Sequence, residues 1–432
     1  MLTLSHPHSI DASFEDTYHY LIGMLERLCG YPLTIERDSE RIAAEPTPQR
    51  LPDGSIRFPL PSSRKGTMHW RLMIPPEAAA DKQCTRIVAK FVTGCKRMAG
   101  EIKQVSDLKE YLIRNSAFLW DDLVMSLTHQ GGQKYNALEL LGALRESLLF
   151  RYEEKPVRLG VLMTWNWHST GEVLMGMGCK YLKARRQEDI HEALRTSKAL
   201  NWLADGEDTL LLVTPAGKIA GLLSVSALAE SATGADWGMV PQRFRHLNSL
   251  LLGRDIVCTT TEAGELYLFR KESVLKWTHQ GWYRVSGPGI VGLLSAHTTP
   301  QAAAVLSDVA VEMSFQKRGG LIAIVGNAED ISEGASPGVA AFFSSDPLLE
   351  ANPDDLPVIL RLASLDGALI VDSHGLIRNA GVILRVPGAH TSAGEGARSA
   401  AASYASTHGL AIKISQDGPI SIYEDGNLVR LL

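Results

Sequence analysis

The spacing of apolar residues in the last third of the chain changes repeatedly between a helical and an extended period. Residues 300–318 and 397–408 carry apolar side chains at helical intervals. Short apolar runs of strand length, bounded by turn residues, occupy residues 319–326, 367–372, 377–386, 409–415 and 419–424. Strands mixed with helices over roughly 140 residues are typical of one α/β domain. We therefore predict a C-terminal domain at residues 291–432, built as a mixed β-sheet flanked by helices.

The residues upstream show the same mixture of periods. A helical pattern begins behind Ser13 and ends at Gly30, short extended pieces follow, and a long helical pattern begins at Pro75. Further strands and helices continue from residue 136 to about residue 285. We predict an N-terminal α/β sensor segment at residues 1–110, ending in a linker helix, and a middle mixed α/β sensor domain at residues 111–290. The alternative for the long helix is an ordinary amphipathic core helix.

One stretch of the middle region resembles a stretch of the C-terminal domain. Residues 208–225 and 367–384 share apolar positions, a turn glycine and an Ala-Gly step. Two interpretations remain open at this point. Any β-hairpin with a glycine turn gives such a likeness, or the middle region has the same fold as the C-terminal domain.

Composition and charge indicate a globular protein of several domains and argue against the classes that bind nucleic acid or span a membrane. The chain has 432 residues, of which 45% are hydrophobic and 21% charged, so it is long enough for two or three folded domains. The net charge of -5 gives no reason to expect nucleic acid or an anionic membrane as the main partner. No uninterrupted apolar stretch reaches the roughly 18 residues of a membrane helix. We expect a soluble, cytoplasmic protein.

The five cysteines and the common catalytic motifs add little. The cysteines are scattered without a C-x-x-C pair, which fits a reducing compartment and indicates neither a disulfide framework nor a zinc site. The sequence contains no P-loop, zincin or nucleophile-elbow motif. The candidate chemistry therefore has to come from the C-terminal domain.

An Asp-Gly-Ala sequence opens the predicted strand at residues 367–372. Phosphoryl transfer requires a carboxylate near the attacking hydroxyl, usually acting through a divalent metal ion. Asp366 can supply that carboxylate, and Gly367 lets the backbone approach a ribose. The alternative is an aspartate that only caps a β-turn.

A second candidate lies where Gly396, Ala397 and Arg398 open a small-residue helix. A helix N-terminus presents unpaired N–H groups that suit a triphosphate. The guanidinium of Arg398 can hold phosphate oxygens in bidentate fashion, or it is a surface arginine without a function. Ser399 can donate a hydrogen bond to a phosphate or cap the helix.

These blocks, in this order, resemble the diadenylate cyclase domain, which condenses two ATP molecules into cyclic di-adenosine monophosphate. Asp366-Gly367-Ala368 matches that family's Asp-Gly-Ala signature, and the strand at 318–326 takes the place of its Gly-Ala-Leu-Ile-Val strand. Residues 396–402 stand where the family has Gly-Thr-Arg-His-Arg-Ala-Ala, and residues 415–418 where it has Ser-Glu-Glu. The resemblance covers about residues 295–432.

The resemblance implies a role for each matched position. Asp366, Gly367 and Ala368 would form the catalytic block, and Asp366 with Asp417 would hold Mg²⁺ or Mn²⁺. The implied nucleotide and phosphate positions are Leu365, Gly396, Ala397, Arg398, Ser399 and Ser415.

The sequence also departs from the family pattern. Ala397, Ser399 and Ala400 replace a threonine, a histidine and an arginine, and Leu365 replaces a histidine that often precedes Asp-Gly-Ala. We predict a nucleotidyltransferase that makes cyclic di-AMP or a related nucleotide from ATP and is regulated by the N-terminal sensor region. The family's chemistry joins two ATP molecules across a two-fold axis, so we expect a homo-oligomer with face-to-face cyclase domains. The alternative is a catalytically inactive nucleotide-binding or sensor protein that retains the cyclase fold.

Overall fold

The computed structural model describes twelve stretches of the chain: residues 14–38, 48–60, 69–101, 137–152, 154–228, 238–252, 255–271, 273–278, 281–285, 290–332, 335–386 and 396–432. The chain divides into two compact units, Met1–His129 and Gln130–Leu432. The predicted boundary at residue 110 lies outside the described residues. Within the described part of the chain, no helix is long and apolar enough to cross a membrane.

The first unit contains a four-stranded antiparallel sheet with the order β1-β4-β3-β2. Its strands are β1 Thr34–Asp38, β2 Gln49–Arg50, β3 Ile56–Pro59 and β4 His69–Ile74. Its helices are α1 Phe14–Cys29, α2 Pro76–Ala80 and α3 Lys82–Glu101, the last of which starts the predicted linker helix. Helix α1 packs against α3, and both bury an apolar face that includes Leu25 and Phe91.

The second unit begins with an eight-stranded sheet with the order β14-β13-β12-β11-β7-β9-β10-β8. Its strands are β7 Gly160–Met163, β8 Lys180–Lys183, β9 Thr209–Val213, β10 Ile219–Ser224, β11 Ile256–Thr260, β12 Leu266–Arg270, β13 Ser273–Thr278 and β14 Gly281–Arg284. Its helices are α5 Ala137–Ser147, α6 Trp167–Gly176, α7 Ile190–Thr196, α8 Lys198–Leu203 and the 3₁₀ helix η2 Gln242–Leu250. Strands β5 Arg151–Tyr152 and β6 Lys155–Pro156 form a separate small hairpin.

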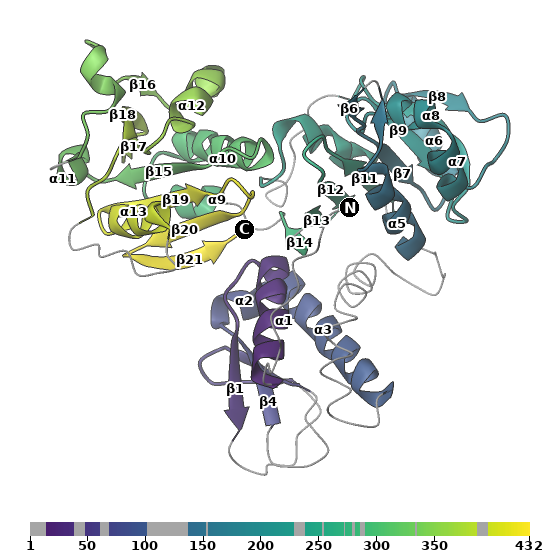
Figure 1. Ribbon diagram of the computed structural model, residues 1–432, viewed down its shortest axis with the longest axis horizontal. Helices are drawn as coiled ribbons and strands as arrows, with labels where there is room; N and C mark the ends of the chain where they lie inside the picture. Colours follow the sequence, from purple (N-terminus) through teal and green to yellow (C-terminus); the bar gives the residue numbers. More distant parts are fainter. Residues whose placement is uncertain are drawn as a thin grey trace. The chain divides into compact units, whose positions relative to one another are not determined.

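The rest of the second unit is a seven-stranded mixed sheet with the order β16-β18-β17-β15-β19-β20-β21. Its strands are β15 Gly320–Val325, β16 Leu349–Glu350, β17 Ala368–Asp372, β18 Leu376–Val382, β19 Gly409–Ile414, β20 Ile420–Glu424 and β21 Asn427–Leu431. Its helical segments are α9 Ile290–Leu294, α10 Pro300–Phe315, α11 Ala328–Ser332, η3 Val339–Phe342, η4 Pro353–Asp355, α12 Leu356–Ala363 and α13 Ala397–Ser406. The predicted α/β class, with a C-terminal mixed sheet flanked by helices, is confirmed (Figure 1).

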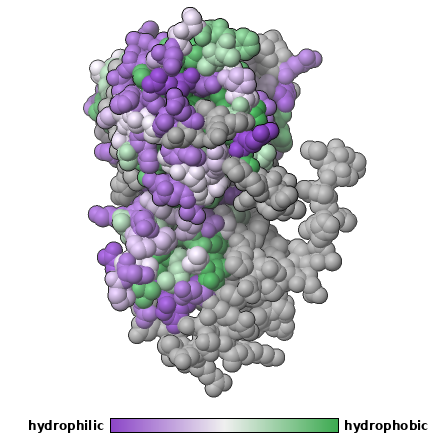
Figure 2. Space-filling view, turned by 90° about the vertical axis from the view of Figure 1, so that its left-hand side faces the viewer, coloured by the Kyte–Doolittle hydropathy of each residue, from purple (hydrophilic) through white to green (hydrophobic). Residues whose placement is uncertain are grey.

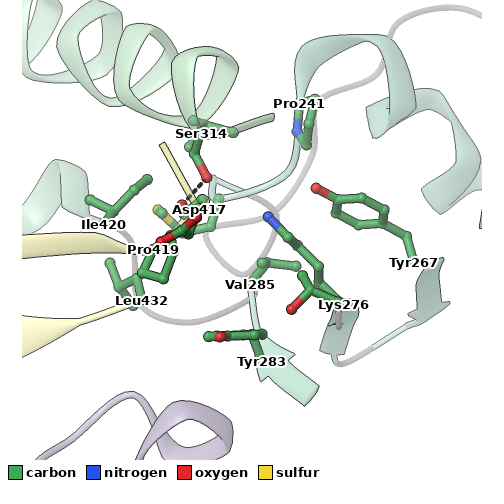
Figure 3. A pocket seen from close by; sticks show the side chains of 14 residues that line it. Pro241, Tyr267, Lys276, Tyr283, Val285, Ser314, Asp417, Pro419, Ile420 and Leu432 are labelled. Atoms are coloured by element: carbon green, nitrogen blue, oxygen red, sulfur yellow. Dashed lines mark hydrogen bonds between the residues drawn. The ribbon is translucent and has the colours of Figure 1, made fainter. Parts of the chain in front are cut away.

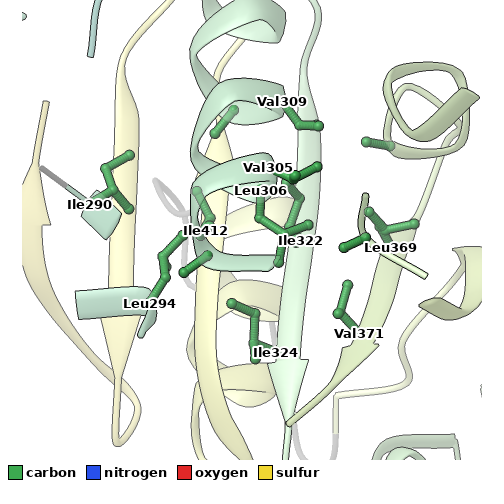
Figure 4. Close-up of a cluster of buried hydrophobic side chains, with 14 of the residues drawn as sticks. Ile290, Leu294, Val305, Leu306, Val309, Ile322, Ile324, Leu369, Val371 and Ile412 are labelled. Carbon is green, nitrogen blue, oxygen red and sulfur yellow. The ribbon is translucent and has the colours of Figure 1, made fainter. Parts of the chain in front are cut away.

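Each face of this C-terminal sheet is covered by its own helix. The N-cap residue Thr299 and Pro300 start α10, whose residues Val305, Leu306 and Val309 lie against the sheet residues Ile322 and Ile412 (Figure 4). Full burial of each such side chain contributes about 1.5–3 kcal/mol. On the opposite face, α13 packs with small residues.

Side chains along each strand point alternately to the two faces of the sheet, and this alternation determines which of them contact α13. Leu321, Ala323 and Ala411 belong to the apolar cluster under this helix, whereas Ile322 and Ile412 belong to the cluster under α10. The small side chains Ala402 and Ala405 let α13 approach the sheet closely. The start of α13 is therefore held over the end of β19 and the start of the antiparallel strand β15.

One face of the molecule shows the distribution of polar and apolar residues on its surface. The face shown in Figure 2 is largely hydrophilic, with small groups of hydrophobic residues between the polar ones. In the C-terminal domain the exposed large apolar side chains include Phe342, Phe343 and Ile383.

The middle and C-terminal sheets share one topology. In each, a central strand (β7 or β15) pairs in parallel with β9 or β17 and antiparallel with β11 or β19. The correspondence continues outward on both sides, from β10 and β8 to β18 and β16, and from β12 and β13 to β20 and β21. Seven strands thus match in order and direction, which a chance hairpin likeness does not explain. The similarity between residues 208–225 and 367–384 belongs to two copies of one strand arrangement.

Candidate functional site

Strand register places most of the candidate residues at one edge of the C-terminal sheet. Leu321 of β15 pairs with Ala368 of the parallel strand β17 and with Lys413 of the antiparallel strand β19. The residues before Leu321 and Ala368 and those after Lys413 therefore meet at the same end of the sheet. This edge carries the Asp-Gly-Ala block on one side and the turn that begins at Ser415 on the other.

The backbone of the Asp-Gly-Ala block requires a glycine at its centre. Gly367 has a φ of +113°, and a Cβ atom there would lie 2.7 Å from the carbonyl carbon of Gly381. Ala368 follows as a buried strand residue, while Leu365 is 38% exposed. This geometry turns the preceding residue, Asp366, away from the sheet.

The carboxylate of Asp366 is available for chemistry. Its side chain is 92% exposed, and its only recorded partner among the described residues is Arg398, whose Nη2 lies 4.0 Å from Oδ1. No backbone N–H of the described chain caps this carboxylate, so the turn-capping alternative does not describe the structure. Asp366 and Arg398, taken from separate blocks of the sequence, lie side by side.

Arg398 is positioned by the start of α13 and by a glycine that the sequence analysis did not single out. Gly396 is the N-cap residue and offers no side chain, and Ala397 is exposed. A Cβ atom at Gly319 would lie 2.5 Å from Nη1 of Arg398, so Gly319 makes room for the guanidinium. The planar group spans the edge between β15 and the Asp366 loop.

Lys413 is a second cation at this edge, and the sequence analysis missed it. Its Nζ donates a hydrogen bond of 2.7 Å to Oγ of Ser399. Lys413 shares a strand face with Ala411, which packs under α13, and this alternation brings a β19 side chain to the helix start. A lysine in an otherwise apolar strand was the available signal. The hydroxyl of Ser399 does not cap the helix; it accepts from Lys413.

The two remaining predicted residues lie in the turn between β19 and β20. Ser415 closes this turn through its carbonyl oxygen, which accepts from the N–H of Gly418 at 3.0 Å. Asp417 lines a small cavity of about 20 Å³ together with Tyr267 and Lys276 of the middle sheet (Figure 3). Its carbonyl oxygen accepts a 2.9 Å hydrogen bond from Nζ of Lys317. No recorded contact among the described residues joins Asp417 to Asp366.

A buried charge cluster anchors this turn to the middle sheet. Nζ of Lys276 lies 3.3 Å from Oε1 of Glu265, and Nζ of Lys317 contacts the same oxygen. Burial lowers the pKa of Lys276, and the nearby Glu265 carboxylate offsets part of that effect. The cluster ties β12 and β13 to the segment after α10, and through Lys317 to Asp417.

The far edge of the same sheet carries a cleft that the sequence analysis did not predict. It has a volume of about 620 Å³ and is lined by residues that include Asp372, His374 and Arg378. Burial acts to raise the pKa of Asp372, but hydrogen bonds from the N–H groups of Leu376 and His374 and from Arg378 outweigh it and lower the pKa. Asp372 is thus a fixed, ionised partner of Arg378, whose Nη2 lies 2.7 Å from Oδ2.

The predicted edge offers one of the carboxylate ligands that a magnesium-type ion needs. Mg²⁺ is commonly held by one or two carboxylates together with substrate phosphates. Asp366 supplies one exposed carboxylate. Within the described residues no group of three or more His, Cys, Asp or Glu side chains could hold a metal ion alone. An ion at this edge would therefore need nucleotide oxygens as further ligands.

Comparison with known proteins gives the C-terminal domain a family. Residues 308–428 match the family model described as "DAC: DisA bacterial checkpoint controller nucleotide-binding". No curated protein matches the chain.

Solved structures also show similarity to part of the chain. A hypothetical membrane spanning protein from Bacillus cereus is 21% identical, with a TM-score of 0.27, over 33% of this chain and 70% of that protein. A cysteine double mutant of DacA from Staphylococcus aureus is 22% identical, with a TM-score of 0.23, over 29% of this chain and 83% of that protein. On the strength of the family model, residues 308–428 form a nucleotide-binding domain of the DisA (DAC) family.

Proposed function

We propose that the C-terminal domain is a nucleotidyltransferase that joins two ATP molecules into cyclic di-AMP or a related nucleotide. One observation carries the proposal: an exposed Asp366 carboxylate faces the Arg398 guanidinium at the edge of a nucleotide-binding domain. An acid and a fixed cation at this separation can act on the two ends of a phosphoryl-transfer reaction, the hydroxyl and the phosphate.

In this proposal, the residues of this edge have separate roles in binding phosphate and in orienting the attacking hydroxyl. Arg398 and Lys413 hold phosphate oxygens, and the free N–H groups at the start of α13 add partial positive charge. Asp366 orients the ribose 3′-hydroxyl of the nucleotide. The hydroxyl oxygen forms a bond to the α-phosphorus of the other nucleotide while the bond to pyrophosphate breaks, and the hydroxyl proton passes to water. A Mg²⁺ or Mn²⁺ ion held by Asp366 and phosphate oxygens would supply charge neutralisation.

Lys413 lies close to the positions at which this sequence departs from the family pattern. Ala397 and Ala400 offer no side-chain donor, and the Ser399 hydroxyl already accepts from Lys413. A lysine placed 2.7 Å from that hydroxyl supplies a cation in the region where the family's second arginine is lost. We propose that Lys413 replaces part of the missing phosphate contact.

The second candidate function is nucleotide binding without turnover. It is favoured by the same two alanines, because each charged hydrogen bond that is lost costs about 1.5–3 kcal/mol of interaction with phosphate. Under this alternative Arg398 and Lys413 still bind ATP, and the N-terminal sensor region receives or relays the binding signal. Regulation by the sensor region and a cytoplasmic location remain part of the proposal in either form.

An activity assay with a matched variant separates the two functions. Purified protein is incubated with ATP and Mn²⁺, and the products are identified by mass spectrometry. We expect a cyclic dinucleotide from the wild type and from Asp354→Asn, which changes an exposed aspartate in η4, and none from Asp366→Asn. ATP binding without product favours the binding-protein alternative, and full turnover by Asp366→Asn contradicts the role of Asp366.

A further inference from the structure

The shared topology of the two sheets gives each part of the C-terminal edge a counterpart in the middle sheet. Strand β9 corresponds to β17, so the loop at residues 204–208 corresponds to the Asp366 loop. Helix η2 precedes β11 as α13 precedes β19. The turn at residues 261–265 joins β11 to β12, as the Ser415 turn joins β19 to β20. The equivalent edge of the middle sheet can thus be identified without any sequence identity.

A cleft of about 470 Å³ opens at this equivalent edge. Its lining comes from each corresponding segment: Arg158 before β7, Glu207 in the loop before β9, Arg243 and Phe244 at the start of η2, and the turn residues Thr261, Glu262 and Ala263. Phe315, Gln316 and Arg318 of the C-terminal domain complete it. This volume lies within the range of about 300–1,000 Å³ that is usual for small-molecule sites.

The cleft is built to hold an anion. Nη1 of Arg158 lies 2.7 Å and Nη1 of Arg243 lies 3.8 Å from the same oxygen, Oε1 of Glu207. Two guanidinium groups that converge on one oxygen form the arrangement by which proteins bind phosphate. Arg243 occupies the second residue of its helix, as Arg398 does in α13.

Further acidic and basic side chains at the cleft contribute to its net charge. Arg243 also pairs with Glu312 at 2.6 Å, and Arg158 lies 3.8 Å from Glu262. Arg318, exposed in the lining, has no recorded side-chain hydrogen bond or ion pair with any described residue. Counted with Glu312, three arginines face three glutamates at the cleft, and Arg318 is the arginine without a recorded acidic partner among the described residues. Arg243 also lies over the ring of Phe315, 4.8 Å from its centroid, which provides an aromatic wall.

The loop before β9 uses one of its carboxylates to hold its own backbone. This loop also carries an Asp-Gly pair, and Gly206 has a φ of +81°. Oδ1 of Asp205 accepts hydrogen bonds from the N–H groups of Glu207, Asp208 and Thr209, each 2.9 Å long. This carboxylate closes the loop, and Glu207, which lies in register with Asp366 when residues 208–225 are aligned with 367–384, is held by Arg158 and Arg243.

We propose that the cleft between Arg158, Arg243 and Arg318 is a second, non-catalytic site that binds a nucleoside phosphate and regulates the C-terminal domain. A phosphate carries more charge and more acceptor atoms than the Glu207 carboxylate, and it takes that carboxylate's place between the two guanidinium groups. The base lies against Phe315. Arg318 directly precedes Gly319, where a Cβ atom would meet the guanidinium of Arg398, so a backbone shift at Arg318 on occupation of the cleft would reach the catalytic edge. The choice of ligand class rests on the proposed nucleotide function.

Binding of α,β-methylene ATP to the full chain, measured by isothermal titration calorimetry, tests the proposal. We expect two sites per chain, of which Arg398→Ala removes one. In the Arg398→Ala background, Arg158→Ala should weaken the remaining site at least about tenfold, because a charged hydrogen bond is lost. Glu207→Gln should instead tighten it by roughly threefold or more, because the competing internal anion is gone. A gain in affinity cannot come from misfolding.

The matched control is Lys218→Ala, which breaks an exposed ion pair with Asp189 in the same sheet and should leave both sites unchanged. Absence of binding in Arg398→Ala, or an isotherm in that background that neither Arg158→Ala nor Glu207→Gln alters, overturns the proposal. Equal affinity for inorganic triphosphate overturns the nucleoside part. Failure of the C-terminal domain to make a cyclic product, with Arg158-dependent binding intact, rejects the proposed function and leaves the second site standing.

Discussion

At the scale of single residues, Gly367 offers the sharpest test of the Asp366 loop. Its φ of +113° and the 2.7 Å approach of a Cβ atom to the Gly381 backbone leave no room for a side chain. We expect Gly367→Ala to lower the free energy of unfolding by about 2–4 kcal/mol, since backbone strain and overpacking each cost about 1–3 kcal/mol. Gly396→Ala is the control, because nothing lies within 4 Å of a Cβ atom there. Equal effects of the two changes in urea denaturation would refute this account.

The interaction of Arg398 with phosphate gives a second prediction at this scale. Replacement by alanine should weaken ATP binding at the C-terminal edge by roughly 1.5–3 kcal/mol, because a charged, bidentate contact is lost. Arg398→Lys should recover only part of the lost binding free energy, since an ammonium group lacks the planar, bidentate geometry of a guanidinium. Arg195→Ala, in α7 of the middle sheet, controls for loss of charge. Unchanged affinity at this edge in Arg398→Ala, measured by calorimetry, would make this residue an ordinary surface arginine.

At the scale of elements, the β17–β18 hairpin depends on the ionised Asp372. Its pKa in the folded state is lowered, so the unfolded chain binds the proton more readily below pH about 4. The stabilisation is therefore present above the unfolded pKa and is lost as the pH falls through the folded pKa. We expect Asp372→Asn to be less stable than the wild type at pH 6 to 8, and the difference in unfolding free energy to shrink in acid. A difference that stays constant down to pH 2 would contradict this.

The charge cluster of Glu265, Lys276 and Lys317 joins β12 and β13 to the Asp417 turn. We expect the stability of this junction to depend on the pairing of these charges. Removing one partner of a buried pair leaves an uncompensated charge and costs about 3–5 kcal/mol. We expect that loss in unfolding free energy for Glu265→Gln, because Lys276 is buried beside it. Glu262→Gln, in the exposed part of the preceding turn, should have little effect. Similar, small losses for both variants would show that the cluster does not hold the junction.

The elements also show how far the sequence alone could lead. Apolar patterns predicted the C-terminal helices and strands, because α10 buries apolar residues at helical spacing and β15 is a continuous apolar run buried on both faces. The Asp-Gly-Ala and Gly-Ala-Arg blocks lie together at one edge. The contact of Lys413 with Ser399 could not be predicted, because it depends on how α13 lies on β19. The pairing of Asp417 with Asp366 as metal ligands remains a prediction. The structure instead ties the Asp417 turn to Lys317, a contact that depends on how the end of α10 lies beside the turn between β19 and β20.

At the scale of the whole molecule, the two sheets of the second unit are unequal copies. At the C-terminal edge Asp366 is 92% exposed beside Arg398, whereas at the middle edge Asp205 accepts three backbone hydrogen bonds and Glu207 is paired with Arg158 and Arg243. A reaction between two bound nucleotides needs a second catalytic half-site, and we expect the middle sheet not to provide it, because its Glu207 is already paired with two arginines. If the proposed cyclase activity is correct, the second half has to come from another chain, in a two-fold arrangement that brings both bound triphosphates into line.

This requirement predicts how activity depends on protein concentration and on mixing. Specific activity should rise with concentration until the dimer is fully formed, and excess Asp366→Asn protein should suppress wild-type activity, because a mixed pair closes only one of the two bonds of the ring. The same excess of Asp354→Asn, which changes an exposed aspartate in η4 and keeps Asp366, should not suppress it. Activity can be followed by mass spectrometry and association by analytical ultracentrifugation. Activity strictly proportional to enzyme in a sample that stays monomeric would exclude the face-to-face mechanism, because that mechanism needs the Asp366 carboxylates of two chains.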